Sequence, residues 1–301
     1  MRSRDLWTPT WGVRCSALPE TLVDQLRAFA VAAPRPFAFS HVTAARLLGI
    51  PVPLSLEDDG EVHIITPTRA NRVRRAEVSG HRGLESRSVV EVQGLPVVDA
   101  ADTWVDLGEY VGRGKPVGLD DLIAAGDAAL DLVGSTARLR KALERRIRPR
   151  GKVTLSYARH RVRPRAWSPM ETRSRLMVVR AGLPEPAHNT DVVSMRGDWL
   201  GVGDLVWKEQ RVVGEYQGVK FHSRARDRTH DRGRRERFEA GDWTVVEIEA
   251  EHIFRVEARA AKLRELAGHL GVSPHLVDVM GAAPQFFAPQ QFQTLRRRRA
   301  G

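Results

Sequence analysis

The segment that most constrains the fold spans residues 204–217, DLVWKEQRVVGEYQ, where two strand-like runs meet at the polar turn KEQR. Asp204 and Glu215 lie symmetrically about the centre of that turn, between Glu209 and Gln210. In an antiparallel hairpin with this centre the two acids face each other, with Cβ atoms about 4.5–5.5 Å apart. Such a pair needs a compensating cation. A hydrated Mg²⁺ suits it, because proteins hold Mg²⁺ by one or two carboxylates together with water and phosphate oxygens.

The alternation within this hairpin predicts a sheet that is covered on both faces. Both faces are partly apolar, as in a sheet that helices cover on both sides. The carboxylate pair is therefore expected to be half-buried and in need of compensation. The two faces consist of Asp204, Val206, Val213, Glu215 and Gln217, and of Leu205, Trp207, Val212 and Tyr216.

Composition suggests a two-domain protein with a polyanionic partner. The chain has 301 residues, 42% of them hydrophobic, and a formal net charge of +11. Such a charge favours nucleic acid through neutralisation of phosphates, although an excess of arginine over lysine also fits a GC-rich genome. A single cysteine, Cys15, excludes an intrachain disulfide. With no apolar run of membrane-spanning length and no secretory signal, we expect a cytoplasmic protein without a membrane partner. Oligomeric state stays open.

Residues 1–148 are expected to form a mostly helical α+β domain. The segment FSHVTAARLLGIP carries a helical apolar stripe that starts after Ser40 and stops at Gly49. It is either the second helix of a helix-turn-helix or a small core helix. Residues 61–67 and 95–98 are predicted strands.

The second half of the chain is expected to be a separate α/β domain. Residues 149–167 are basic and weakly patterned, which is typical of a linker. Residues 168–270 predict the order α-β-β-β-α-β-α around a mixed sheet. Residues 271–301 end in four arginines and are predicted to be a disordered or loosely docked basic tail.

Other candidate site residues surround the hairpin. Glu171 lies three positions after Ser168, so it either completes a capping box or reaches the same metal ion. His222 follows the second strand and is a candidate proton carrier or a solvated histidine. The candidate nucleic-acid contacts, which otherwise form a solvated helix face, are Arg224, Arg226, Arg234 and Arg235. Motifs of P-loop, Rossmann, CxxC zinc and GxSxG proteins are absent from the sequence.

Several motifs in order resemble a known family. SPME, GLPEP, GDLVW, GEYQG, a following histidine, an Asp231 to Arg235 helix and AGDWTVVEI are similar to the very-short-patch-repair-like branch of the PD-(D/E)XK nuclease superfamily, over about residues 166–255. FSHVTAARLLGIP and QGLPVVDAADTWVDL resemble abortive-infection type IV antitoxin regulators, which carry a winged-helix-like region.

The resemblance implies a restriction-endonuclease-like domain that hydrolyses phosphodiester bonds of DNA with Mg²⁺ or Mn²⁺. It assigns metal binding to Glu171, Asp204 and Glu215, and a possible proton transfer to His222. Gln217 stands where the superfamily has a lysine, and Glu247 stands where an arginine is expected.

Three hypotheses therefore compete. The first is a metal-dependent DNA endonuclease with an N-terminal DNA-binding or regulatory domain. The second is an antitoxin-like transcriptional repressor that uses a degenerate nuclease fold for binding only. The third is a two-domain protein with an unrelated ligand.

Overall fold

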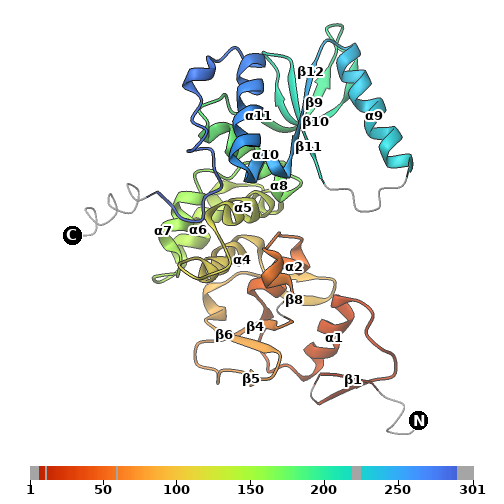
Figure 1. The fold of residues 1–301 in the computed structure, drawn as a ribbon. Helices are drawn as coiled ribbons and strands as arrows, with labels where there is room; N and C mark the ends of the chain where they lie inside the picture. The colour runs from red at the N-terminus through yellow and green to blue at the C-terminus, as the bar shows by residue number, and fades with distance from the viewer. Residues whose placement is uncertain (1–6, 11, 59, 219–224, 290–301) are drawn as a thin grey trace, which may run out of the picture. The chain divides into compact units, whose positions relative to one another are not determined.

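The computed structural model describes residues 7–10, 12–58, 60–218 and 225–289 (Figure 1). The chain divides into two compact units, Met1–Arg161 with Phe287–Gly301, and Val162–Phe286. We call them unit 1 and unit 2. The division falls inside the predicted linker, but that segment also contains helix α7 (Lys152–Ala158), whose Leu155 is fully buried. Much of the predicted linker is therefore a packed part of unit 1.

Unit 2 is built on a four-stranded mixed sheet with the order β12-β11-β10-β9. Strand β10 (Trp199–Trp207) runs antiparallel to both of its neighbours, β9 (Ala187–Val193) and β11 (Val212–Gln217). Strand β12 (Thr244–Glu249) pairs in parallel with β11, so helix α9 (Ala225–Ala240) is the crossover between them.

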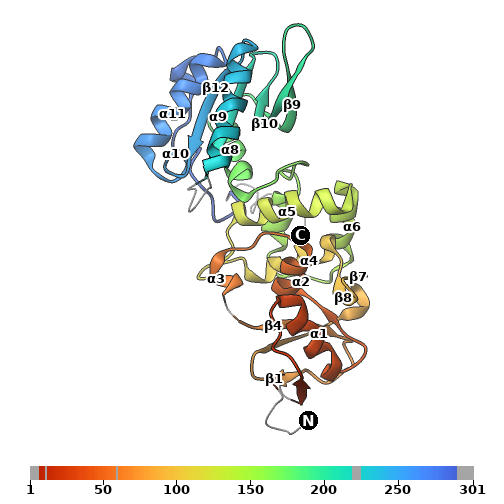
Figure 2. The ribbon, with the colours of Figure 1, turned by 90° about the vertical axis from the view of Figure 1, so that its right-hand side faces the viewer.

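Helices cover both faces of this sheet, as the hairpin pattern predicts. On one face Leu205 and Trp207 pack with helices α8 (Pro169–Arg180) and α11 (Val256–His269). On the other face Val206 and Val213 pack with Phe238 of α9. Figure 1 shows α9 and α11 on opposite sides of the strands, and Figure 2 gives the view turned by a right angle. The predicted element order is confirmed, with the last helix divided into α10 (Ala250–Phe254) and α11.

The predicted loose tail is wrong for its first part. Val272 and Val277 pack against the core of unit 2, and Ala282 is buried within it. The amide of Asp278 donates to the carbonyl of Ala181 at 3.0 Å. A short 3₁₀ helix (Pro274–Leu276) lies between Val272 and Val277 in the sequence. Sparse apolar residues without a regular period are enough to dock this segment. The four terminal arginines lie outside the described residues.

Unit 1 contains a six-stranded mixed sheet with the order β5-β6-β4-β3-β8-β7, and a two-stranded sheet. Its strands come before a run of four helices, α4 to α7, in line with the expected α+β class. The strands are β1 (Trp7–Thr10), β2 (Val13–Cys15), β3 (Ala38–Phe39), β4 (Val62–Thr66), β5 (Arg74–Arg75), β6 (Val78–Arg82), β7 (Val89–Val92) and β8 (Leu95–Val98). The helices before α7 are α1 (Leu22–Ala32), α2 (His41–Leu48), α3 (Leu54–Glu57), α4 (Ala100–Leu107), α5 (Leu119–Val133) and α6 (Thr136–Arg145), with 3₁₀ turns at Leu84–Ser86 and Gly108–Tyr110.

Helix α2 behaves as a core helix. It begins after Ser40 and ends at Gly49, whose φ of +69° is the left-handed conformation that glycine adopts without strain. Its residues His41 to Ala45 are all buried. Burial of this kind supports the core-helix interpretation over an exposed recognition helix.

Part of the positive charge of unit 1 is committed to buried ion pairs. Asp102 is fully buried on α4 and meets Arg145 at 2.6 Å and Arg146 at 3.1 Å. Asp106, one turn later, meets Arg146 at 2.9 Å and Arg87 at 2.8 Å. These contacts tie α6 and the chain before β7 to α4.

Among the helices that the structure describes, none combines the length and the apolar character that a membrane span requires.

Gly203 on β10 lies where the sheet of unit 2 leaves no room for a larger side chain. A Cβ at Gly203 would lie 2.7 Å from Val213 Cγ1 and 2.9 Å from Val206 Cγ2. Gly203→Ala is therefore expected to lower the stability of unit 2 by about 1–3 kcal/mol, measured by hydrogen exchange of the β10 and β11 amides. Gly268→Ala on α11 is the control, because its Cβ would meet nothing within 4 Å. Equal stability of the two variants would contradict this account.

Candidate functional site

The hairpin register places Asp204 beside Glu215, as predicted. Leu205 pairs with Gly214 and Val206 with Val213, so the next position of the ladder sets Asp204 opposite Glu215. Neighbouring strands extend this position into a row, because Glu215 pairs with Glu247 on β12, and Asn189 on β9 falls opposite Asp204. We call Asn189, Asp204, Glu215 and Glu247 the polar row. It crosses all four strands of unit 2.

Asp204 is an acid that holds its proton unusually tightly. Burial and the neighbouring charge of Glu215 raise its pKa to about 7, and Glu171 adds a smaller effect in the same direction. The amide of Tyr216 donates to Asp204 Oδ2 at 2.9 Å and partly opposes this rise. Asp204 is therefore close to half-protonated at neutral pH, as expected for buried acids that share a site.

Glu215 is compensated at only one of its two oxygens. Its side chain is buried, and Oε2 accepts a hydrogen bond from Arg234 of α9 at 2.8 Å. Burial raises the pKa of Glu215, and Arg234 counteracts that rise. Oε1 is buried and has no hydrogen-bond partner among the described residues. A carboxylate oxygen without a partner, beside a half-protonated acid, is a location where a cation would be stabilised.

Glu171 is linked to the polar row through Asn189. Its amide donates to Ser168 Oγ at 3.2 Å, so Ser168 caps α8 as predicted. The Glu171 carboxylate instead accepts from the amide of Trp167 at 3.0 Å and from Asn189 Nδ2 at 2.6 Å. Asn189 Oδ1 is buried without a hydrogen-bond partner among the described residues. Glu171 therefore does more than cap its helix.

The three predicted metal ligands do not form one tight cluster. Glu171, Asp204 and Glu215 are not among the groups whose ligand atoms all lie within 4.8 Å of one another, in the part of the chain that the structure describes. Glu171 is held by its hydrogen bond from Asn189 and acts on Asp204 only through its charge. The pair Asp204 and Glu215 is thus the centre of the site, and Glu171 belongs to its surroundings.

Two of the four arginines predicted to contact nucleic acid, Arg234 and Arg235, form ion pairs within unit 2. Arg234 pairs with Glu215, while Arg235 pairs with Glu247 at 2.6 Å and with Glu239 at 2.8 Å. Where the resemblance predicts an arginine, β12 carries Glu247. The arginine that pairs with it, Arg235, lies on α9.

The remaining predicted residues surround the row or lie outside the description. Gln217 is half-buried at the end of β11, in register with Glu249. His222 and Arg224 lie outside the described residues, and only the backbone of Arg226 is described, within α9. The role of Asn189 was not predicted from the sequence, because it depends on strand pairing that leaves no local motif.

A second group of side chains that no sequence motif marks lies in unit 1. The ligand atoms of His41, His81 and Glu109 all lie within 4.8 Å of one another.

Comparisons with known proteins give a narrow match. No family model matches the chain, and no solved structure matches it. The chain is 29% identical over 106 residues to the uncharacterized protein Rv2248 of Mycobacterium tuberculosis, and equally to its counterpart MT2308 in a second strain. The match covers 35% of this chain and 38% of each relative, so it spans well under half of either protein.

Asp204 should make stability depend on pH in the absence of metal. Its pKa of about 7 in the folded state exceeds the ordinary 3.8, so the folded protein binds this proton more tightly than the unfolded chain does. Stability then falls as pH rises between about 4 and 7. Asp204→Asn removes the penalty and should stabilise unit 2 by about 2–4 kcal/mol above pH 7, with no gain near pH 4.

Urea unfolding with a chelator present, followed across this pH range, measures the effect. Glu209→Gln is the matched control, because Glu209 is exposed at the tip of the same hairpin and should change stability little at any pH. A gain from Asp204→Asn that does not vary with pH would contradict the expectation.

Proposed function

We propose that unit 2 is a metal-dependent endonuclease-like unit that acts on DNA through Asp204 and Glu215. One observation carries the proposal. Two acids face each other on a covered sheet, one with its pKa raised to about 7 and the other with a buried oxygen that lacks a partner among the described residues. An isolated pair of this kind is unfavourable without a cation, and its donor set fits Mg²⁺ or Mn²⁺.

Each residue of the site has a separate role in this proposal. Asp204 and Glu215 would hold the metal, which when bound polarises a phosphate oxygen and lowers the pKa of a water. Asp204 would have to be ionised to act as a ligand. Arg234 fixes the orientation of Glu215 by its hydrogen bond to Oε2. Glu171 and Asn189 stabilise the surroundings of the pair, and Gln217 offers an amide that can orient water without adding charge.

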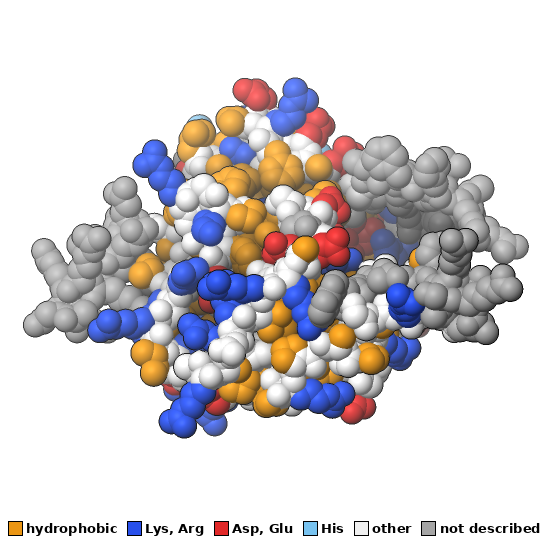
Figure 3. Space-filling model, turned by 90° about the horizontal axis from the view of Figure 1, so that it is seen from below, with side chains coloured by type: hydrophobic (Ala, Val, Ile, Leu, Met, Phe, Trp, Pro, Cys, Tyr) orange, Lys and Arg blue, Asp and Glu red, His pale blue; other side chains and the backbone are white. Residues whose placement is uncertain are grey.

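The charge of the chain supports a nucleic-acid partner. The net charge of +11 favours phosphate neutralisation. Figure 3 shows Lys and Arg side chains spread among hydrophobic and acidic ones on the face that it displays. The net charge, and not the pattern on this face, supports the proposal.

A second function is favoured by the arginines of α9. Arg234 already supplies a positive charge to Glu215, and Arg235 does the same for Glu247. Gln217 brings no charge where the superfamily has a lysine. An intramolecular cation at the pair would allow the fold to persist without metal, as in a repressor that binds DNA and does not cut it.

Nicking of supercoiled plasmid separates the two functions. With Mg²⁺ or Mn²⁺ the wild-type chain should nick DNA, and Asp204→Ala or Glu215→Ala should reduce the rate by about 100-fold or more, since a bound metal contributes several kcal/mol. Glu209→Gln should cleave like wild type.

DNA binding is measured in parallel by fluorescence anisotropy at increasing salt. Salt-sensitive binding without cleavage under any divalent metal would reject the endonuclease and support the repressor. Cleavage that survives Asp204→Ala would place the activity elsewhere or in a contaminant.

A further inference from the structure

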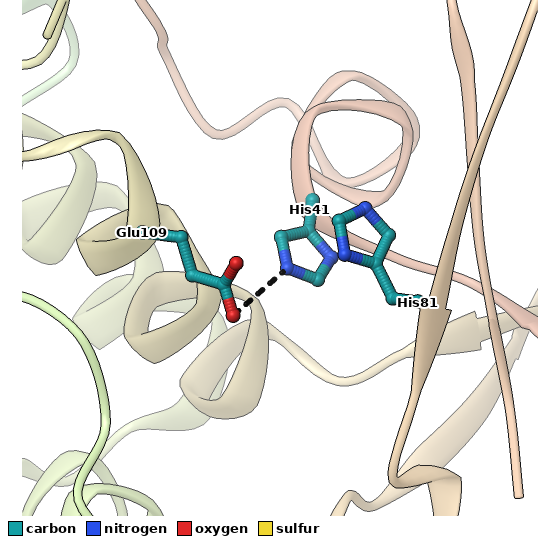
Figure 4. A group of neighbouring side chains, drawn as sticks. All are labelled: His41, His81 and Glu109. Atoms are coloured by element: carbon teal, nitrogen blue, oxygen red, sulfur yellow. Dashed lines mark ion pairs between the residues drawn. The ribbon is translucent and has the colours of Figure 1, made fainter. Parts of the chain in front are cut away.

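Three side chains of unit 1 converge from separate elements onto one point. His41 is the first residue of α2, His81 lies on β6, and Glu109 lies in the 3₁₀ turn after α4. Their ligand atoms all lie within 4.8 Å of one another. Figure 4 shows the Glu109 carboxylate directed at the His41 ring, with the His81 ring stacked against it. This group is independent of the acids of unit 2.

His41 is held in place with one nitrogen directed at the carboxylate. The residue is fully buried and adopts a φ of +51°, uncommon for a side chain other than glycine. Ser40 Oγ, which makes no cap hydrogen bond to α2, lies 3.0 Å from His41 Nδ1. Partners of this kind orient metal-binding histidines by fixing the tautomer.

The other nitrogen of His41 has the spacing of a metal ligand. Nε2 lies 3.8 Å from Glu109 Oε1 and has no hydrogen-bond partner among the described residues. Two ligands of a tetrahedral Zn²⁺, each about 2.0–2.1 Å from the ion, lie about 3.4 Å apart. The observed gap is too long for a hydrogen bond and close to the separation that a shared ion would set.

His81 supplies the third donor after a rotation of its ring. The His41 and His81 rings are stacked with centroids 3.5 Å apart and planes inclined by 15°. Parallel rings cannot both direct an in-plane lone pair at one ion, so one of them must tilt. His81 is half-buried and, like Glu109, borders a cavity of about 390 Å³. Its Nε2 lies 3.1 Å from His63 Nδ1, which leaves Nδ1 for the ion.

We propose that unit 1 binds a divalent transition metal of the zinc class through His41, His81 and Glu109. Two imidazoles and one carboxylate are a donor set for Zn²⁺ and similar ions, whereas Mg²⁺ and Ca²⁺ prefer oxygen ligands alone. Three protein ligands leave a fourth position open toward the cavity. Arg72, Arg82 and Lys115 also line that cavity, so an anion is the expected occupant of the open position.

Metal titration of the full chain tests the site. The parent chain for this test carries Asp204→Asn and Glu215→Gln, so that the acids of unit 2 do not contribute to metal binding. It is first freed of metal by chelation. Zn²⁺ is then titrated by calorimetry, and Co²⁺ by visible absorption, in excess Mg²⁺. We expect one Zn²⁺ per chain and a Co²⁺ spectrum typical of nitrogen and oxygen ligands.

Two variants report on individual ligands. Glu109→Gln and His81→Gln should each weaken Zn²⁺ binding by about 100-fold or more, since even residues outside the first ligand set alter affinity 10–100-fold. His275→Gln, at an exposed histidine of unit 2, should bind like the parent chain. Circular dichroism confirms that each variant is folded.

Unchanged Zn²⁺ affinity in both variants would overturn the proposal. So would the absence of Zn²⁺ binding to the parent chain. Because Zn²⁺ binding is measured in a chain that lacks the carboxylates of Asp204 and Glu215, failure of the endonuclease and failure of this site are separate results.

Discussion

Two carboxylates that face each other on a covered sheet are the constraint on which unit 2 depends. Asp204 and Glu215 cannot both be charged there without compensation, and the surrounding elements supply it in parts. Arg234 of α9 forms an ion pair with Glu215, and the Tyr216 amide donates a hydrogen bond to Asp204. The pKa of Asp204 is raised to about 7, so it keeps its proton to a higher pH than an ordinary aspartate. The unit therefore tolerates the pair without metal, yet retains a buried carboxylate oxygen that has no hydrogen-bond partner among the described residues.

Both units place charge inside the fold and balance it locally. In unit 1, Asp102 and Asp106 of α4 are buried against Arg87, Arg145 and Arg146. Removing one partner of such a group costs about 3–5 kcal/mol, because the other charge is left buried. Several arginines are thus structural and are not available to contact a nucleic acid.

The fold and the site differ in how far the sequence predicts them. The hairpin register follows from the symmetry of Asp204 and Glu215 about the turn, and the two-faced alternation correctly predicts helices on both sides of the sheet. Helix α2 ends at Gly49 as predicted. The linker and the tail are poorly predicted, because α7 and the segment around Val277 pack through a few apolar contacts without a period.

By itself the sequence determined the strands of unit 2, their order along the chain and the pairing of its two acids, since all depend on local alternation and one short turn. Only the tertiary structure decided what each acid meets. Glu171 and Arg234 reach the polar row from two different helices, and His41, His81 and Glu109 meet across unit 1. Contacts between residues far apart in the chain depend on how the elements pack, and no spacing in the sequence records that packing.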